Sequence, residues 1–217
     1  EQLDLDNSYS SRPEEPQDIV LYGFGRIGRL MARMLVQTTG PGNYFRLKAV
    51  VVRKGGENDL VKRASLLRRD SVHGRFNGTI RVDLDNELLV INGNPVKFIY
   101  ASSPSEINYS DFNIKYPIVI DNTGIWRDEE ALGQHLNCGA SKVILTAPAK
   151  GNIRNIVFGV NDSALTDKDK IISAASCTTN AIVPVLKLIS DKYGISNGHI
   201  ETVHSYTNDQ NLIDNYH

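Results

Sequence analysis

Cysteine is scarce in this chain, and its scarcity excludes a disulfide-rich protein and a zinc protein that uses pairs of cysteines. Only two cysteines occur among the 217 residues, too few for a disulfide scaffold or for a zinc site built on cysteine pairs. Cys138 and Cys177 also lie too far apart in the sequence to form a CxxC motif. We therefore expect a reduced, cytoplasmic compartment, no metal site, and one thiol that is free for chemistry.

Long apolar runs and an excess of one charge are missing as well. No stretch approaches the roughly 18 apolar residues of a membrane span, and the N-terminus lacks the apolar core of a signal peptide. The net charge is -1, and without a long basic run we expect neither a nucleic-acid nor a membrane partner. With 41% hydrophobic and 23% charged residues, the chain has the composition of a globular protein with room for one domain and part of a second.

The order of the predicted elements indicates a dinucleotide-binding fold. Residues 1–17 are polar and aperiodic, which predicts an extension or linker. A short apolar strand, Ile19–Tyr22, then leads into a glycine-rich turn and a helix that ends at Gly40–Gly42, and the strand Leu47–Val52 follows. Strand, glycine turn, helix and strand form the first half of a dinucleotide-binding βαβ unit.

The rest of the chain predicts further α/β structure with one antiparallel insertion. Turn residues between Thr79 and Tyr100 predict a meander, and the parallel pattern resumes at Pro117. The fold class is therefore α/β, with a Rossmann-type domain over 18–175 and the start of an α+β catalytic domain over 176–217. The expected elements are a helix Asn58–Leu67 capped by Asn58, strands Thr79–Leu84, Glu87–Ile91, Val96–Tyr100 and Pro117–Asp121, a helix Asp128–Leu136, strands Lys142–Ala147, Ile156–Val160 and Ile171–Ala174, a helix Ala181–Tyr193, and a strand His199–Tyr206.

Three glycines follow the first strand at the spacing GxGxxG. Such a triplet is a weak signal alone, but here a strand precedes it and a helix follows, as dinucleotide binding requires. Gly23 permits the tight turn, Gly25 lets the backbone approach a pyrophosphate, and Gly28 lets the helix pack closely on the strand. The alternative is a purely structural glycine turn.

The choice between NAD and NADP depends on the end of the second strand. The acidic residue that usually holds the ribose hydroxyls is missing there, and Arg53 and Lys54 follow Val52 instead. An arginine at this place can accept a 2′-phosphate, so we treat NADP use, alone or beside NAD, as a hypothesis, with NAD or NADP as the expected cofactor. The alternative is a solvated turn with Glu57 or Asp59 folding back toward the ribose.

One cysteine stands where a helix is predicted to begin. Cys177 follows an apolar strand and precedes the helical pattern of Ala181–Tyr193. Free backbone N–H groups and the positive end of the helix dipole favour the thiolate, which is the nucleophilic form. A buried structural cysteine is the alternative. A nucleophilic thiol gains from a base within reach, and His204 is the candidate, although a structural histidine is the default interpretation.

Four motifs together resemble the phosphorylating glyceraldehyde-3-phosphate dehydrogenases, in order as well as in content. The resemblance runs from Asp18 to the end of the chain and leaves residues 1–17 outside, similar to the tail of an N-terminal extension in longer bacterial forms. The motifs are GFGRIGR (Gly23–Arg29), DSVHGRF (Asp70–Phe76), SCTTN (Ser176–Asn180) and VHSYT (Val203–Thr207).

The resemblance implies a role for each matching residue. Cys177 attacks the aldehyde of D-glyceraldehyde 3-phosphate, His204 acts as the base, and inorganic phosphate releases 1,3-bisphosphoglycerate from the thioester. The family is also typically a homotetramer. Ser176, Thr178 and Thr207 match positions that contact substrate or phosphate, while Arg26, Ile27, Thr123, Gly124 and Thr146 match positions at the cofactor.

Departures from the family pattern leave two functional alternatives open. Ser102 replaces an arginine found near the adenine in many members, which adds to the question of cofactor preference. Residues Asn208–Asp214 also resemble erythrose-4-phosphate dehydrogenases, and a dinucleotide-binding regulator without catalysis is the other alternative. The family's later substrate arginine and nicotinamide-facing asparagine would lie beyond His217, so we expect these 217 residues to be inactive alone.

Overall fold

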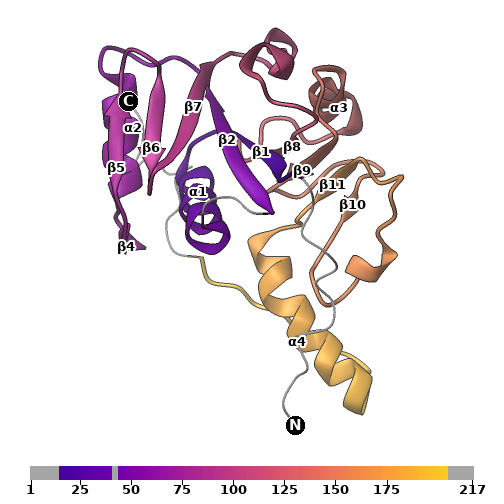
Figure 1. The fold of residues 1–217 in the computed structure, drawn as a ribbon. Coiled ribbons are helices and arrows are strands. Elements are labelled where there is room, and N and C mark those ends of the chain that lie inside the picture. The colour runs from indigo at the N-terminus through magenta and orange to yellow at the C-terminus, as the bar shows by residue number, and fades with distance from the viewer. Residues whose placement is uncertain (1–14, 41–43, 205–217) are drawn as a thin grey trace.

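The computed structural model describes residues 15–40 and 44–204. Most of the described strands belong to one nine-stranded sheet (Figure 1). Its strands are β1 (Gln17–Tyr22), β2 (Phe45–Val52), β5 (Ile80–Asp83), β6 (Leu88–Ile91), β7 (Asn94–Tyr100), β8 (Ile118–Asp121), β9 (Lys142–Leu145), β10 (Arg154–Asn155) and β11 (Ile171–Ser173). A separate hairpin consists of β3 (Arg69–Asp70) and β4 (Gly74–Arg75).

The strand order reverses at β1. The sheet runs β10-β11-β9-β8-β1-β2-β7-β6-β5, so β1 has β2 on one side and β8 on the other, both parallel to it. In an open α/β sheet, ligands bind outside the carboxyl ends of the strands at such a reversal. The topology thus points to the carboxyl ends of β1 and β8 as the place of a site.

Helices cover both faces of the sheet. Ile19 and Leu21 of β1 pack with α1 (Arg26–Thr39) and α2 (Asp59–Arg68), while Val20 and Tyr22 face the other side. That second face carries short 3₁₀ turns, Pro104–Glu106 and Tyr109–Phe112, and is flanked by α3 (Glu129–Asn137). Because β1 is buried on both faces, its apolar run is continuous rather than alternating. The predicted α/β, Rossmann-type fold class is confirmed.

The predicted antiparallel insertion is also confirmed. Strands β5, β6 and β7 pair antiparallel, and β7 then joins β2 in parallel. The turn at Asn92 and Gly93 has positive φ at both residues, which Asn-Gly pairs tolerate. Asp128 caps α3, as its carboxylate accepts a hydrogen bond from the Ala131 N–H at 2.9 Å.

The predicted strand Ile156–Val160 is wrong. The strand in this region is the two-residue β10, and the chain then enters a turn. Side chains take the backbone donors that a strand would have used, since Asn161 Oδ1 accepts from the Val157 N–H and Asp162 Oδ1 from the Gly159 N–H, each at 2.8 Å. Asx contacts of this kind compete with sheet pairing.

Two further predictions fail in part. His199–His204, the described part of the predicted strand His199–Tyr206, is exposed and belongs to no strand, since no ladder partner pairs with it among the described residues. Asn58 does precede α2, but its left-handed backbone, with φ of 62°, leaves the side chain without a capping hydrogen bond.

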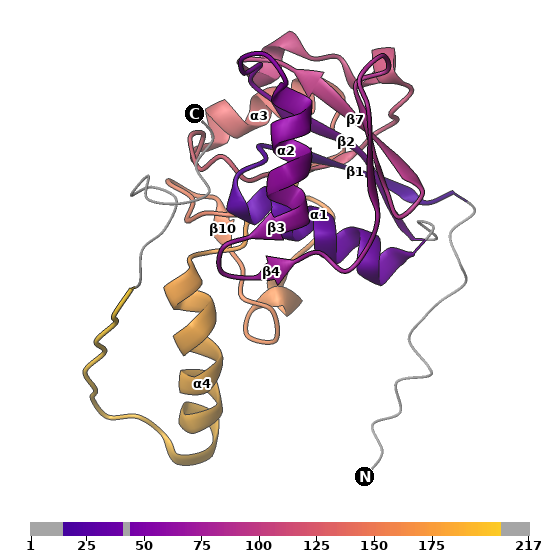
Figure 2. The ribbon, with the colours of Figure 1, turned by 90° about the vertical axis from the view of Figure 1, so that its left-hand side faces the viewer.

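The last helix, α4 (Cys177–Tyr193), projects from the sheet domain (Figure 2). It begins four residues after β11 ends and has no buried residue within the described chain. Among the helices that the structure describes, none combines the length and the hydropathy of a transmembrane segment.

Candidate active site

A cleft of about 910 Å³ opens at the carboxyl ends of the parallel strands. Its walls come mainly from the segments that follow β1, β2, β7, β8, β9 and β11, and it lies at the reversal of the strand order. Gly28, Gly124, Thr178 and His204 are outside this lining, and Thr207 is outside the described residues. The predicted site residues that line the cleft are Gly23, Gly25, Arg26, Ile27, Arg53, Thr123, Thr146, Ser176 and Cys177.

The glycine turn is shaped by close contacts that only glycine allows. Gly23 has φ of 94°, and a Cβ there would come within 2.9 Å of the Thr123 Cγ2. A Cβ at Gly28 would collide with the carbonyl oxygen of Gly23. The first turn of α1 is therefore pressed onto the loop that leaves β1, which keeps the backbone N–H groups at the cleft.

The start of α1 suits an anionic group. Gly25 occupies the N-cap without a side chain, and the first turn contains no acidic residue. Arg26 and Arg29, both in the first turns, line the cleft. Open N–H groups, the helix dipole and two cations together match the diphosphate of a dinucleotide.

The far wall, after β2, is cationic. Arg53 and Lys54 are exposed there, and Arg63 completes the wall. Asp59 does not fold back toward the cleft, because it is buried and its Oδ2 accepts a hydrogen bond from Arg63 Nε at 2.8 Å. No carboxylate belongs to the lining within the described residues.

Asp121, at the end of β8, organises the floor of the cleft and was missed by the sequence analysis. Its Oδ1 accepts hydrogen bonds from the Thr123 N–H at 2.8 Å and the Thr123 hydroxyl at 2.6 Å. Thr146 donates to the Asp121 carbonyl through both its N–H and its hydroxyl. Asp121 Oδ2 lies 3.3 Å from His135 Nε2, and both side chains are fully buried. The available signal was an acidic residue closing an apolar strand.

Tyr22 forms a neutral wall beside this pair. Its ring meets those of Trp126 and His135 edge-on, with centroids 5.4 and 4.8 Å away. Burial first, and then the Asp121 carboxylate, raise the pKa of Tyr22 well above its ordinary value. The phenol therefore stays protonated over the physiological pH range.

Cys177 is the first residue of α4, as predicted. Ser176 caps the helix, since its Oγ accepts a hydrogen bond from the Thr179 N–H at 2.9 Å. Ala175 has a left-handed backbone with φ of 60°, which turns the chain sharply from β11 into the helix. The Asn180 side chain fixes this turn by donating to the carbonyls of Ala174 and Ser176. The thiol is exposed at the wall of the cleft, so the interpretation as a buried structural cysteine does not apply to it.

His204 lies beside the start of α4. Its Nε2 is 3.4 Å from Thr178 Oγ1, and the side chain is exposed. Within the described residues its hydrogen bond goes to Thr178 rather than to Cys177. The structure thus brings His204 to the residue next to the thiol.

Comparisons with known proteins agree with this arrangement. Residues 17–129 match the family model described as glyceraldehyde 3-phosphate dehydrogenase, NAD binding domain, and residues 176–217 match the model of the C-terminal domain of the same family. A glyceraldehyde-3-phosphate dehydrogenase-like protein of Pseudomonas aeruginosa is 64% identical over 204 residues, 94% of this chain and 44% of the relative. Glyceraldehyde-3-phosphate dehydrogenases of Thermotoga maritima and Clostridium acetobutylicum are 40% and 38% identical over 90% and 92% of this chain and 56% of each relative.

The chain spans about half the length of the curated relatives it matches. It contains the NAD-binding domain of their family and the beginning of the domain that follows. The glycine turn, the strand reversal and the thiol at a helix start all lie within the matched residues. By its match to the family model over residues 17–129, the chain belongs to the glyceraldehyde-3-phosphate dehydrogenase family.

Proposed function

We propose that this chain carries the cofactor site and the nucleophile of an enzyme that oxidises D-glyceraldehyde 3-phosphate to 1,3-bisphosphoglycerate with NAD or NADP and inorganic phosphate. One observation carries the proposal: Cys177 and the glycine turn line the same cleft. A thiolate at a helix start is placed to bond to an aldehyde carbon, and the bound dinucleotide supplies the hydride acceptor.

In this mechanism, residues of the chain form one covalent bond to the substrate and accept one proton from it. The Cys177 thiolate attacks the aldehyde carbon to give a thiohemiacetal, and the Cys177 backbone N–H stabilises the charge on its oxygen. His204 takes the hydroxyl proton as the carbon loses hydride, which leaves a thioester. Inorganic phosphate then attacks the thioester carbonyl, and the thiolate leaves.

Other residues of the cleft hold the ligands in this proposal. Gly23, Gly25, Gly28 and Arg26 hold the diphosphate of the dinucleotide, and Arg53 meets its adenosine ribose. Ile27, Thr123, Gly124 and Thr146 surround the remainder of the cofactor. Ser176, Thr178 and Thr207 contact substrate or phosphate, with the Ser176 hydroxyl also capping α4.

Replacing the nucleophile tests the activity. In the intact protein we expect Cys177→Ala to reduce turnover by at least about 10³-fold, measured as dinucleotide reduction in the presence of D-glyceraldehyde 3-phosphate and phosphate. The matched control is Cys138→Ser, because Cys138 is half-buried and its thiol donates to the Pro104 carbonyl at 3.2 Å, away from the cleft. Equal activity of Cys177→Ala and the wild type would reject the mechanism.

The cationic wall supports NADP as a cofactor, alone or beside NAD. A 2′-phosphate would meet Arg53 and Lys54, and no carboxylate of the described lining would repel it. The measurement is the ratio of kcat/KM for the two dinucleotides. A strong preference for NAD would reject NADP use.

Two alternatives are less favoured. The relatives' names support glyceraldehyde 3-phosphate over erythrose 4-phosphate as the substrate, and an assay with both aldehydes, with and without phosphate, separates them. A dinucleotide-binding regulator would not need an exposed thiol at a helix start. Rapid alkylation of Cys177 by iodoacetamide at neutral pH supports the enzyme, and slow alkylation supports the regulator.

The cellular setting and assembly are proposals that follow from family membership. We propose a cytoplasmic homotetramer in which residues 18–175 form the dinucleotide-binding domain and residues from 176 begin the catalytic domain, with 1–17 as an extension. Light scattering coupled to size exclusion checks the tetramer, and a monomeric mass would contradict it.

A further inference from the structure

The hairpin β3–β4 has no part in the function described so far, yet it contacts α1 at the cleft. The hairpin spans Arg69–Arg75 and shares all but its first residue with the motif Asp70–Phe76, and it lies close beside α1 (Figure 2). The side chain of Asp70 is 1% exposed, although an acidic residue is rarely buried without a reason. The reason is a set of donors that converge on its two oxygens.

Two of these donors are the guanidinium groups at the start of α1. Asp70 Oδ2 accepts from Arg26 Nε at 3.3 Å and from Arg29 Nη2 at 3.4 Å. Arg26 also donates through Nη2 to the hydroxyl of Ser71 at 3.0 Å. Arg26 and Arg29 line the dinucleotide cleft, whereas Asp70 lies behind them and is not part of the lining.

The other oxygen ties the carboxylate to its own hairpin. Asp70 Oδ1 accepts from the backbone N–H groups of Val72 and His73 at 3.0 and 2.9 Å, and His73 Nδ1 lies 3.0 Å away. Burial alone would raise the pKa of Asp70, but the hydrogen bonds from His73 and Val72, and the charge of Arg26, hold it well below its ordinary value. The carboxylate therefore stays charged and keeps its geometry.

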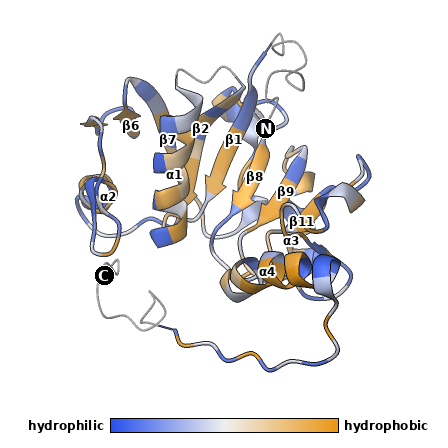
Figure 3. Ribbon diagram, turned by 90° about the horizontal axis from the view of Figure 1, so that it is seen from below, coloured by the Kyte–Doolittle hydropathy of each residue, from blue (hydrophilic) through white to orange (hydrophobic). Residues whose placement is uncertain are grey.

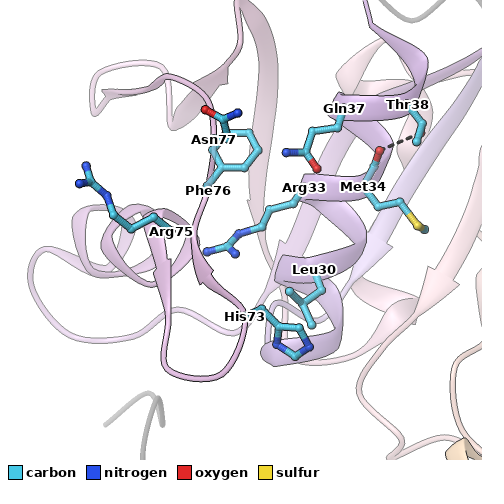
Figure 4. A pocket seen from close by; sticks show the side chains of 9 residues that line it. All are labelled: Leu30, Arg33, Met34, Gln37, Thr38, His73, Arg75, Phe76 and Asn77. Carbon is cyan, nitrogen blue, oxygen red and sulfur yellow. Dashed lines mark hydrogen bonds between the residues drawn. The ribbon is translucent and has the colours of Figure 1, made fainter.

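A third arginine fixes the hairpin to the same face of α1. Arg33 donates to the carbonyls of Leu67 and Gly74, and its guanidinium lies 5.9 Å from the centre of the Phe76 ring. Figure 4 shows the Arg33 side chain extending from α1 toward the segment of His73 and Arg75, beside a cavity of about 290 Å³. Residues 26, 29 and 33 share one face of a helix, so the hairpin is anchored along it.

We propose that Asp70 is a positioning residue of the dinucleotide site: it holds Arg26 and Arg29 in the orientation that receives the ligand's diphosphate at the start of α1. This inference rests on the proposed binding of a dinucleotide. Arg26 and Arg29 carry like charges and would repel each other without the carboxylate that both of them contact, and having to order them on binding would weaken the affinity for the ligand. Asp70 orders them before the ligand arrives.

The charge of Asp70, taken without its positioning of the arginines, would have the opposite effect on anion binding. Removing the negative charge of Asp70 raises the positive potential at the cleft and would tighten the binding of an anion. Loss of the positioning of Arg26 and Arg29 would instead weaken the binding of the anion. The direction of the change in Kd therefore distinguishes the two effects.

The experiment is a double-mutant cycle on the intact protein, with Kd for NAD⁺ and NADP⁺ measured by isothermal titration calorimetry. Asp70→Asn is expected to raise Kd on the order of ten-fold, the size of one disturbed charge-assisted hydrogen bond. In the Arg26→Ala background the same substitution is expected to have a smaller effect, because Asp70 then acts through Arg29 alone. The kinetic signature is a raised KM for the dinucleotide with kcat unchanged at saturation.

Asp18→Asn is the matched control. Asp18 is also buried and paired with an arginine, since Arg46 Nη2 lies 2.7 Å from its Oδ1, but it stands at the start of β1, away from the cleft. It is expected to lower thermal stability without changing Kd. If Asp70→Asn does not fold by circular dichroism, Ser71→Ala takes its place, with an expected rise in Kd of about two-fold from the loss of one hydrogen bond.

Several results would overturn the proposal. An unchanged or lowered Kd in Asp70→Asn, or in Ser71→Ala where that variant is used, would show that positioning is not at work. An equal loss with and without Arg26 would show that Asp70 does not act through it. If the wild-type protein bound neither dinucleotide, the proposed function itself would fail, and this inference with it.

Discussion

At the scale of single residues, the proposed choice between NAD and NADP depends on Arg53. We expect Arg53→Asp to reduce kcat/KM for NADP by about 100-fold or more, because a carboxylate beside a 2′-phosphate costs several kcal/mol. The effect on NAD is expected to be much smaller. Steady-state kinetics with both dinucleotides measure it, and Arg81→Asp, an exposed position on the edge strand β5, is the control for surface charge. Equal losses with NAD and NADP would contradict the assignment.

Gly28 is the tightest point of the glycine turn. We expect Gly28→Ala to destabilise the protein by about 1–3 kcal/mol, as overpacking does, and to weaken dinucleotide binding, because the new Cβ would collide with the Gly23 carbonyl. Urea denaturation and calorimetric titration measure the two effects.

Gly133→Ala is the matched control for Gly28→Ala. Gly133 lies inside α3 with no atom within 4 Å of a built Cβ, so this substitution is expected to stabilise the protein by about 0.5–1 kcal/mol. A Gly28 variant that behaved like the Gly133 variant would argue against the packed turn.

Sequence reasoning found the residues whose roles follow from local pattern and missed those whose roles follow from contact. Gly23, Gly28 and Cys177 stand in motifs that a strand and a helix frame, and the structure puts them where the pattern predicts. Asp121 and Asp70 gain their importance from partners far away in the sequence, such as His135 and Arg26. No spacing rule connects such pairs before the fold is known.

At the scale of elements, the hairpin β3–β4 has a stability that depends on pH. The pKa of Asp70 is lowered from 3.8 in the folded protein, so folding favours its charged form. The stabilisation by the Asp70 carboxylate is fully present at pH values above the ordinary pKa of a carboxyl group, and it is lost as the pH falls toward the lowered pKa. We expect the stability difference between wild type and Asp70→Asn to be constant near neutral pH and to shrink below about pH 4.

Urea denaturation at several pH values measures this difference. Asp18→Ala serves as a control for the loss of a buried, paired carboxylate at a distance from the hairpin. A stability difference between wild type and Asp70→Asn that grew as the pH fell would have the wrong sign and would reject the assignment.

Elements with strong apolar periodicity were predicted well, whereas segments in which side chains accept hydrogen bonds from the backbone N–H groups were not. β1, β2 and β8 are buried runs that can only be central strands, whereas β10 is short and exposed. Asn161 and Asp162 convert the apolar Ile156–Val160 into a turn by taking its backbone donors. Residues His199–His204 have strand-like composition but no neighbour within the described chain to pair with.

At the scale of the whole chain, the described residues divide into a packed sheet domain and an exposed helix. Hydrophobic residues concentrate along β1 and β8 at the centre of the sheet (Figure 3). In contrast, α4 has no buried residue within the described chain, and Val185, Leu188 and Tyr193 are 51%, 71% and 76% exposed. The candidate cofactor site is thus built on the packed sheet domain, while Cys177, the proposed nucleophile, stands at the start of a helix that this domain holds only at its first turn.

This division predicts how a protein of these 217 residues would behave by itself. We expect it to bind dinucleotide, because the sheet and the glycine turn are packed, and to show no turnover, because α4 is held only at its first turn. Hydrogen exchange followed by mass spectrometry is expected to show fast exchange along Ala181–Tyr193 and slow exchange in β1 and in the buried turns of α1. Added NAD⁺ should slow exchange at residues 23–29 while leaving α4 unchanged. Protection of α4 equal to that of α1, or measurable oxidation of the aldehyde by this chain alone, would contradict the division.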